Sequence, residues 1–303
     1  MNATKPADQF RIGLAMTAFG GLILSFDVPL VRLGHGEAWA VIALRSISTF
    51  LVTIVVWSLL RFVTRRDIPL MPGRAGLGAG LCYGAATIGF LMSIYHTDAA
   101  NSVFIIAFNP MLCALLAWLF LGERPSASTV ATMVAMIGGV ALIVAPGLSG
   151  GHLLGDSLAF FAALMLAAAI TIGRATPRPL GFAPLIATIF PAMIAGSIAV
   201  PQGISIDNPG WILLDGAVMM PVAFWCLATG PRYLPAAVVG MFYLLETVLA
   251  PVWMWLIFGD VPAAATLIGG TIIVAALAAH SLWESIRRQA VTTETLAADL
   301  TRG

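Results

Sequence analysis

The sequence contains very little charge. Only 10% of its 303 residues are Asp, Glu, Lys or Arg, whereas 60% are apolar. Soluble globular domains carry about 25% charged residues, so an ordinary water-soluble enzyme is excluded. A helix that spans a bilayer needs about 20 mostly apolar residues, so this chain has room for about ten such helices joined by short loops. The composition therefore predicts an all-α integral membrane protein.

Signals for metals, redox chemistry and nucleotides are also missing. The three cysteines, Cys82, Cys113 and Cys226, stand singly in apolar runs, without the Cys/His spacing of a metal or redox site. The sequence has no Gly-x-x-x-x-Gly-Lys-Ser/Thr loop, so ATP is not the direct energy source of this chain. The net charge of +1 gives no reason to expect a nucleic-acid partner. We expect no cofactor and no metal.

Apolar runs separated by Gly, Pro and charged residues divide the chain into ten candidate spans. Their ranges are 12–32, 38–60, 75–95, 99–121, 128–145, 153–173, 182–201, 210–229, 235–258 and 264–286. Of the 15 Lys and Arg residues, thirteen fall on the side shared by both termini, whereas only Arg32 falls on the other side and Arg45 lies inside the second span. Basic loops stay in the cytoplasm. This pattern predicts a multi-pass protein of the cell inner membrane with both termini cytoplasmic.

The two halves of the chain show an internal repeat. A shift that places Gly122-Glu123 on Gly259-Asp260 also places Pro125 on Pro262, without a gap over some forty residues. Five spans in each half would make the second half insert upside down relative to the first. We therefore predict two inverted five-helix repeats, 1–146 and 147–290, followed by a cytoplasmic tail, 291–303. Secondary transporters use this arrangement to build two alternating gates around a site near the membrane midplane.

The segments 109–125 and 245–260 resemble the paired signature of the EamA type within the drug/metabolite transporter superfamily. In that signature a Pro-containing helix ends in Leu-Gly-Glu and is followed by a Gly-rich helix, once in each half. The second copy departs from it at Thr247 and Asp260. The resemblance implies ten helices in two repeats and a transporter of small metabolites or drugs. It also points to the family's bacterial exporters of amino acids, aromatic ones included.

Ionisable side chains inside a membrane cost about 2.5–3.5 kcal/mol each on insertion scales and often mark transport pathways. Glu246 lies near the middle of the ninth span, where it is a candidate for binding a substrate amine or a proton. Asp27 in the first span and Arg45 in the second are candidates for a gate or an ion pair. A purely structural role for each of the three remains open.

Aromatic and amide side chains complete the predicted substrate site. Tyr243 shares a helix face with Glu246. Asn109 is the repeat equivalent of Glu246 and lies close to Asn101 and Phe108 around the fourth helix. The remaining candidates are the aromatic residues Tyr83, Phe90 and Trp225. Packing and interhelical hydrogen bonding are the alternative roles of these residues.

Three functions follow from these features, in decreasing order of support. The first is a secondary transporter that exports amino acids, hydrophobic or aromatic ones in particular, by alternating access. The second is efflux of lipophilic cations, for which Glu246 and Asp27 would supply the countercharge. The third is a membrane-embedded enzyme, which the scattered histidines and the lack of an acid–base cluster disfavour. Proton coupling and oligomeric state are left open.

Overall fold

The computed structural model describes residues 6–65, 69–71, 73–97, 102, 105–145, 153–177, 180–259, 261 and 264–300. Within these ranges the regular structure is helical, and helices occupy most of the ranges that the apolar runs predict, although the first part of the range 99–121 lies largely outside the described residues. Seven helical segments among the described residues are long and apolar enough to cross a membrane, and two more apolar helices are shorter. The chain is therefore an all-helical, multi-pass membrane protein.

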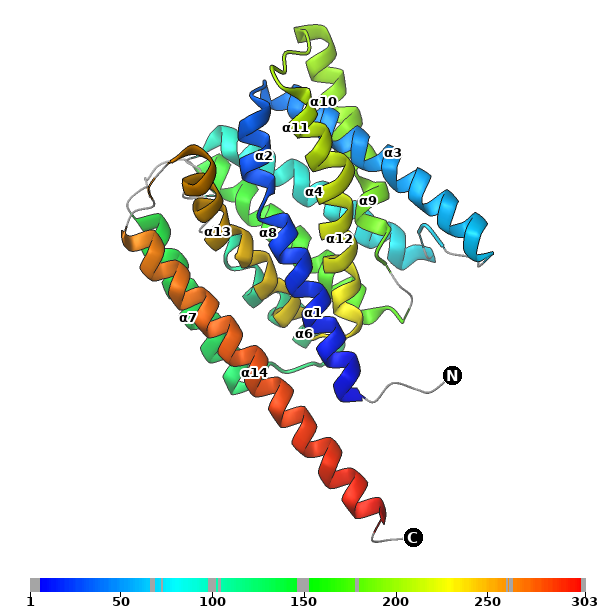
Figure 1. The fold of residues 1–303 in the computed structure, drawn as a ribbon, viewed down its shortest axis with the longest axis vertical. Coiled ribbons are helices and arrows are strands. Elements are labelled where there is room, and N and C mark those ends of the chain that lie inside the picture. The colour runs from blue at the N-terminus through cyan, green and yellow to red at the C-terminus, as the bar shows by residue number, and fades with distance from the viewer. Residues whose placement is uncertain are drawn as a thin grey trace.

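The helices are arranged in one bundle (Figure 1). The first half contains α1 (Pro6–Leu24), α2 (Asp27–Gly34), α3 (Ala38–Thr64), α4 (Gly73–His96), α6 (Asn109–Leu121) and α7 (Ala127–Val144). The second half contains α8 (Leu153–Ala175), α9 (Ala183–Ala187), α10 (Ile189–Gln202), α11 (Pro209–Leu214), a π-helical turn η2 (Asp215–Met219), α12 (Met220–Thr229), α13 (Ala236–Phe258) and α14 (Ala264–Leu300).

Several predicted spans are not continuous α-helices. The first span is interrupted at Ser25 and Phe26, between α1 and α2. Pro29 explains this break, because it has no N–H to donate to the Ser25 carbonyl one turn earlier. The seventh span bends at Thr188, between α9 and α10, and the eighth contains the π-helical turn. Such interruptions free backbone groups and place side chains at depths where an unbroken helix would not.

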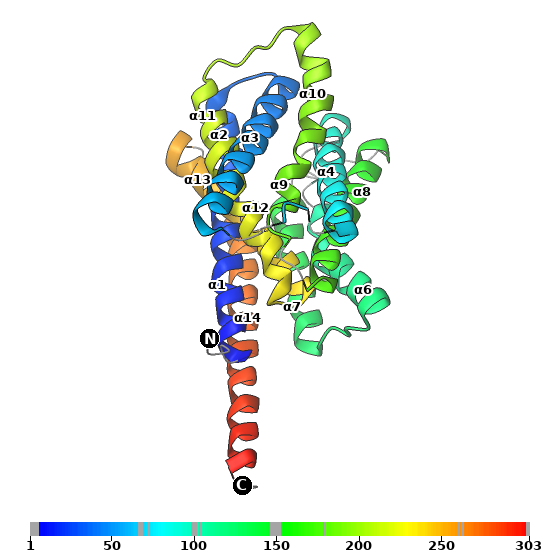
Figure 2. The same ribbon diagram turned by 90° about the vertical axis from the view of Figure 1, so that its right-hand side faces the viewer.

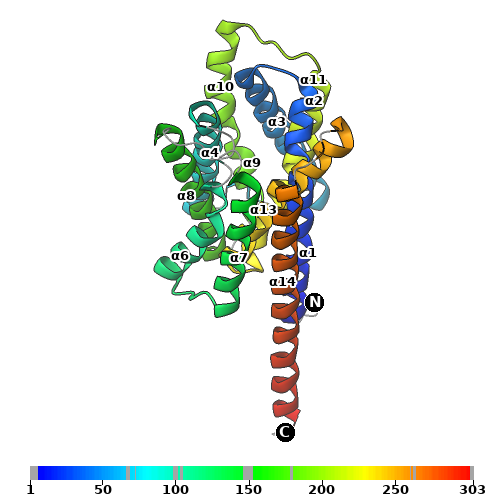
Figure 3. The same ribbon diagram turned by 90° about the vertical axis from the view of Figure 1, so that its left-hand side faces the viewer.

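Helices from the two halves pair with one another. The most extensive contacts join α4 to α8, α7 to α14, α3 to α10, α1 to α12 and α6 to α13. In Figures 2 and 3, α1, α2 and α11 lie on one side of the bundle and α4, α6 and α8 on the other. The central helix is α13, which contacts α1, α2, α6, α7, α8 and α14. Its residues 236–244 are fully buried and form much of the hydrophobic core.

The two ends of the bundle differ. The start of α1 and the end of α14 lie at the same end, and α14 extends beyond the other helices there (Figures 2 and 3). At the opposite end, the loop before α3 pairs with the loop before α11. Gly36 and Ile206 form an antiparallel bridge, and three backbone hydrogen bonds join residues 34–37 to residues 205–208. The opposite end is therefore tied together by its loops.

Candidate functional site

Four ionisable residues from four helical segments gather inside the bundle, and we call them the charged cluster: Asp27, Arg45, Asp215 and Glu246. Arg45 Nη1 on α3 donates a hydrogen bond of 2.6 Å to Asp27 Oδ1, in the first turn of α2. Arg45 Nε lies 3.7 Å from Asp215 Oδ2, in the π-helical turn. The structure thus brings the two predicted ion-pair residues together and adds a second carboxyl group to them.

Asp215 is the residue that sequence reasoning missed. Its side chain is 0% exposed, and neither carboxyl oxygen has a hydrogen-bond partner among the described residues. A buried carboxylate normally requires several donors or a close ion pair. The signal was available, because Asp215 lies within the apolar run 210–229 and carries a charge that has to be explained.

Close packing at Gly216 holds Asp215 next to Arg45. A Cβ atom at position 216 would lie 2.5 Å from the Arg45 carbonyl oxygen and would overlap Ser48 Oγ. Thr49 Oγ1 fixes the same contact by donating a hydrogen bond of 2.6 Å to the Gly216 carbonyl oxygen. The absence of a side chain at Gly216 and the hydrogen bond to its carbonyl oxygen therefore set the distance between α3 and the eighth span.

Glu246 lies on the central helix α13 and completes the charged cluster. It is half-buried and within electrostatic reach of Asp27, Arg45 and Asp215. Gly21 on α1 permits this approach, because a side chain there would collide with the Phe242 carbonyl oxygen and with Leu245. The cluster contains three carboxyl groups and one guanidinium, so it carries an excess of acid.

The aromatic candidates Tyr83 and Tyr243 are buried near one another between α4 and α13, and their hydroxyl groups interact electrostatically. The Tyr243 hydroxyl has no hydrogen-bond partner among the described residues. The Tyr83 ring meets Phe224 of α12 edge to face, with centroids 6.1 Å apart. Because Tyr243 lies one turn before Glu246 on α13, an aromatic group adjoins the acidic one.

A second aromatic contact closes the cluster toward the end opposite the termini. Trp253 on α13 stacks on Phe26, with ring centroids 4.4 Å apart, and its Nε1 donates a hydrogen bond of 2.8 Å to Ser25 Oγ. Both partners sit at the break between α1 and α2. The break is thus pinned to the central helix directly beside Asp27.

Asn109 joins helices rather than facing the charged cluster. It is 1% exposed, its Nδ2 donates a hydrogen bond of 3.1 Å to the Ala163 carbonyl oxygen on α8, and its Oδ1 accepts from Cys113 Sγ. Gly240 on α13 packs directly against it. This geometry favours the structural role for the Asn109 amide.

We expect Asn109→Ala to lower the free energy of unfolding by about 1 kcal/mol, because it removes the interhelical hydrogen bond from the Asn109 amide to the Ala163 carbonyl oxygen. Thermal unfolding of purified protein in detergent would measure the loss. The matched control is Asn208→Ala, since Asn208 is exposed and caps α11 with no side-chain hydrogen bond. Equal stability of the Asn109→Ala protein and the parent would contradict the assigned role.

Three further predicted site residues, Phe90, Phe108 and Trp225, lie apart from the charged cluster. Phe108 lines an apolar hollow with Ile105, Met111, Leu112, Leu115 and Phe160. Trp225 is 42% exposed and packs against Gly181 on the outside of α12. Phe90 is half-buried on α4, and Asn101 lies outside the described residues. The structure does not bring Phe90, Phe108 or Trp225 to the charged cluster, and Phe224 takes the inward position next to Trp225.

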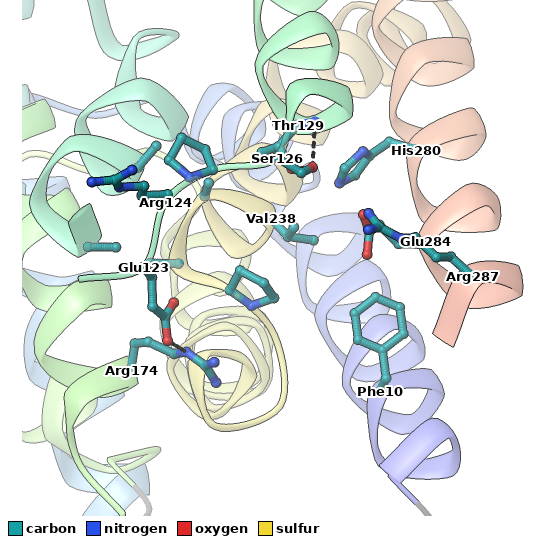
Figure 4. Close-up of a pocket in the computed structure, with 16 residues that line it drawn as sticks. Phe10, Glu123, Arg124, Ser126, Thr129, Arg174, Val238, His280, Glu284 and Arg287 are labelled. Carbon is teal, nitrogen blue, oxygen red and sulfur yellow. Dashed lines mark hydrogen bonds and ion pairs between the residues drawn. The ribbon is translucent and has the colours of Figure 1, made fainter. Parts of the chain in front are cut away.

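A cavity of about 630 Å³ opens at the end of the bundle where the termini lie. Its lining comes from α1, α6, α7, α8, α13 and α14, and Figure 4 shows charged side chains around it. Glu123 and Arg174 form an ion pair of 2.9 Å on one side. His280 of α14 is 3% exposed and has no partner for either ring nitrogen among the described residues. The cavity is therefore a vestibule on the side of the termini, lined by both apolar and charged side chains.

Broken helices around a charged group inside a helical bundle are the construction of a membrane transporter. Residues 11–145 match the EamA-like transporter family. A protein of Streptantibioticus cattleyicolor described as a probable terminal-alkyne amino-acid exporter is 25% identical over 273 residues, which cover 82% of this chain and 86% of that protein. The first half of the chain is therefore similar to EamA-type transporters, and the chain as a whole is similar to a protein described as an exporter.

The fold has a counterpart among solved structures. One of them, titled only "Crystal structure of protein", superposes with a TM-score of 0.74 over 90% of this chain and 98% of its own length. Its sequence is 16% identical, so the likeness concerns the fold alone.

Proposed function

We propose that this transporter exports amino acids from the cell by alternating access, with the charged cluster as its substrate site. The observation that carries the proposal is the cluster itself, which gathers one guanidinium and an excess of carboxyl groups inside the helical bundle. A free amino acid carries a carboxylate and an ammonium group. Arg45 would bind the carboxylate, and Glu246 with Asp27 would bind the ammonium. The name of the relative from Streptantibioticus cattleyicolor supports the same substrate class.

The proposal includes ten spans in two inverted repeats, 1–146 and 147–290, in the inner membrane with both termini cytoplasmic. The helix pairing supports it. If each span in one half is replaced by its counterpart in the other half, the pair α1 and α12 becomes the pair α8 and α4, which is also in contact. The pairs α3 with α10, α6 with α13 and α7 with α14 each become themselves. The helices α6 and α13 also both end at a glycine with positive φ, Gly122 at 69° and Gly259 at 75°.

Hydrophobic and aromatic amino acids fit the cluster's surroundings best. The Tyr83 ring meets Phe224 edge to face and its hydroxyl interacts with that of Tyr243, which lies one turn before Glu246 on α13. An apolar side chain on this side of Glu246 would meet aromatic carbon while its charged groups meet the cluster. The vestibule on the side of the termini and the tied loops at the opposite end correspond to a state that is open to the cytoplasm.

Efflux of lipophilic cations is the second candidate, because the acid excess of the cluster favours any cation. Competition in counterflow with reconstituted vesicles separates the two functions without any mutation. We expect phenylalanine to compete with labelled phenylalanine at least tenfold better than phenethylamine, because the amine has no carboxylate for Arg45 and loses a charge-assisted hydrogen bond worth about 1.5–3 kcal/mol. Equal competition by the amine would favour cation efflux, and no uptake of any labelled amino acid would overturn the substrate class.

Replacing Glu246 with Gln tests the ammonium site. We expect Glu246→Gln to weaken binding of amino acids by about tenfold or more, because a neutral amide cannot provide the ion pair that the ammonium needs. The half-saturation concentration for counterflow measures this change. The matched control is Glu37→Gln, since Glu37 is exposed at the start of α3. An unchanged half-saturation concentration in the Glu246→Gln protein would remove Glu246 from the site.

A further inference from the structure

Asp215 differs from the other acids of the charged cluster in what surrounds it. Its carboxyl group is completely buried and accepts no hydrogen bond from any described residue, whereas Asp27 accepts a direct bond of 2.6 Å from Arg45. The guanidinium of Arg45 lies between the two carboxyl groups, with its Nε 3.7 Å from Asp215 Oδ2. Arg45 therefore pairs with Asp27, and a small movement of its guanidinium would pair it with Asp215 instead.

We propose that Asp215 is the proton site of the transporter, and that Arg45 moves between Asp27 and Asp215 as the proton leaves and returns. In the arrangement described, Asp215 is the neutral acid and Asp27 the carboxylate paired with Arg45. This inference rests on the proposed function, because it names what drives the export.

The groups around Asp215 support this assignment. The segments that pack against the π-helical turn are α2, α3, α11 and α12. Asp27 of α2 and Arg45 of α3 face Asp215, α11 has no ionisable side chain, and Cys226 of α12 packs instead against Gly20 of α1. Glu246 of α13 adds a further negative charge. If Asp215 were ionised, it would share the Arg45 guanidinium with Asp27 and Glu246 and would have no hydrogen-bond donor of its own. Burial strongly disfavours an ionised carboxyl group in such surroundings.

The exchange conserves protons and charge. Asp215 releases its proton to the water of the vestibule side and becomes a carboxylate, and Arg45 transfers to it. Asp27 is then free to bind the ammonium of an incoming amino acid together with Glu246. After the solute has left on the opposite side, a proton from that side binds Asp215, and Arg45 returns to Asp27. One proton thus enters the cell for each amino acid that leaves.

Infrared difference spectra of the purified protein test the proton site without any transport. The parent protein is expected to show the carbonyl-stretch band of a protonated carboxyl group at neutral pH. Asp215→Asn should remove this band. Asp27→Asn should remove it as well, because Arg45 then pairs with Asp215 and displaces its proton. Glu246→Gln is the matched control and should keep the band. Persistence of the band in Asp215→Asn, or its loss in Glu246→Gln, would overturn the proposal.

Transport in reconstituted vesicles tests the coupling. An interior more acidic than the medium should stimulate uptake of labelled phenylalanine by the parent protein, and this stimulation should be absent in Asp215→Asn, with uptake compared with and without the gradient in the same variant. Stimulation of equal size in Asp215→Asn would overturn the coupling role. If the infrared band behaves as expected but no amino acid is transported, the proton site stands and the proposed substrate class fails. Gel filtration and circular dichroism of each variant establish that it is folded.

Discussion

Arg45→Gln is expected to lower the free energy of unfolding by about 3–5 kcal/mol, the cost of removing one partner from a buried ion pair. The change would leave Asp27 and Asp215 next to one another with no cation between them, and Glu246 close by. The glutamine side chain would fill much of the space that Arg45 occupies, so the lower free energy of unfolding would come from the missing positive charge. The apparent midpoint of thermal unfolding in detergent measures it.

A matched control and a rescue distinguish this effect from a general loss of packing. Arg61 is on the same helix α3 but is exposed, with its guanidinium 5.3 Å from the Trp57 ring centroid, so Arg61→Gln should cost less than about 1 kcal/mol. Combining Arg45→Gln with Asp27→Asn and Asp215→Asn removes the unpaired acids and should restore most of the stability. A triple variant as unstable as Arg45→Gln would contradict the electrostatic explanation.

Gly216→Ala should destabilise the protein by about 2–3 kcal/mol, in the upper part of the range for overpacking a close contact. The added Cβ atom would meet the carbonyl oxygen of Arg45 at 2.5 Å and its Cα atom at 2.9 Å, and backbone atoms cannot turn aside as a side chain can. The π-helical turn would have to move away from α3. We therefore also expect transport to fall severely, because Asp215 would move away from Arg45.

Gly196→Ala is the control for this substitution. Gly196 lies inside α10, and nothing is within 4 Å of a Cβ atom built there. The same change should leave the stability equal or raise it by about 0.5–1 kcal/mol, because alanine is the better helix former. Thermal unfolding of both proteins in one detergent makes the comparison. Equal effects at the two positions would show that contact with α3 is not what requires glycine at 216.

The sequence predicts the helical ranges well because lipid leaves few alternatives. A long apolar run inside a membrane has to satisfy its backbone internally, so hydropathy locates the helices 38–60 and 235–258 within a few residues of α3 and α13. The charge of Glu246 in the middle of such a run likewise makes it a candidate site residue from the sequence alone. The helix α14 is longer than predicted, since it continues past residue 286 to Leu300 beyond the apolar segment.

Asp215 could not be ranked from the sequence because its burial depends on another helix. It lies only a few residues into the run 210–229, where an acidic side chain normally reaches the interface. Its enclosure comes from the contact of Gly216 with Arg45 and Ser48, which joins residues far apart in the chain. Hydropathy records the depth of a residue along its own helix but not its neighbours across the bundle.

The choice between Phe224 and Trp225 depends on the same turn. A π-helical turn inserts an extra residue, which rotates everything after it by about 100° relative to an unbroken α-helix. The turn Asp215–Met219 precedes both aromatic residues. The periodicity of an unbroken α-helix therefore does not predict which of the two side chains faces the interior of the bundle. In the structure Phe224 faces Tyr83 and Trp225 faces outward.

The loops that bridge the end opposite the termini form only a weak closure in the proposed transport cycle. In the proposed motion, opening that end would separate Gly36 from Ile206 and break the three backbone hydrogen bonds between the loops. Each contributes about 1 kcal/mol net, and water replaces the lost partners as the loops part. Such a closure is weak enough to open often by thermal motion. The rate of the transport cycle would then be set in the interior, by the passage of Arg45 from one carboxylate to another, and not by the loops that close the surface.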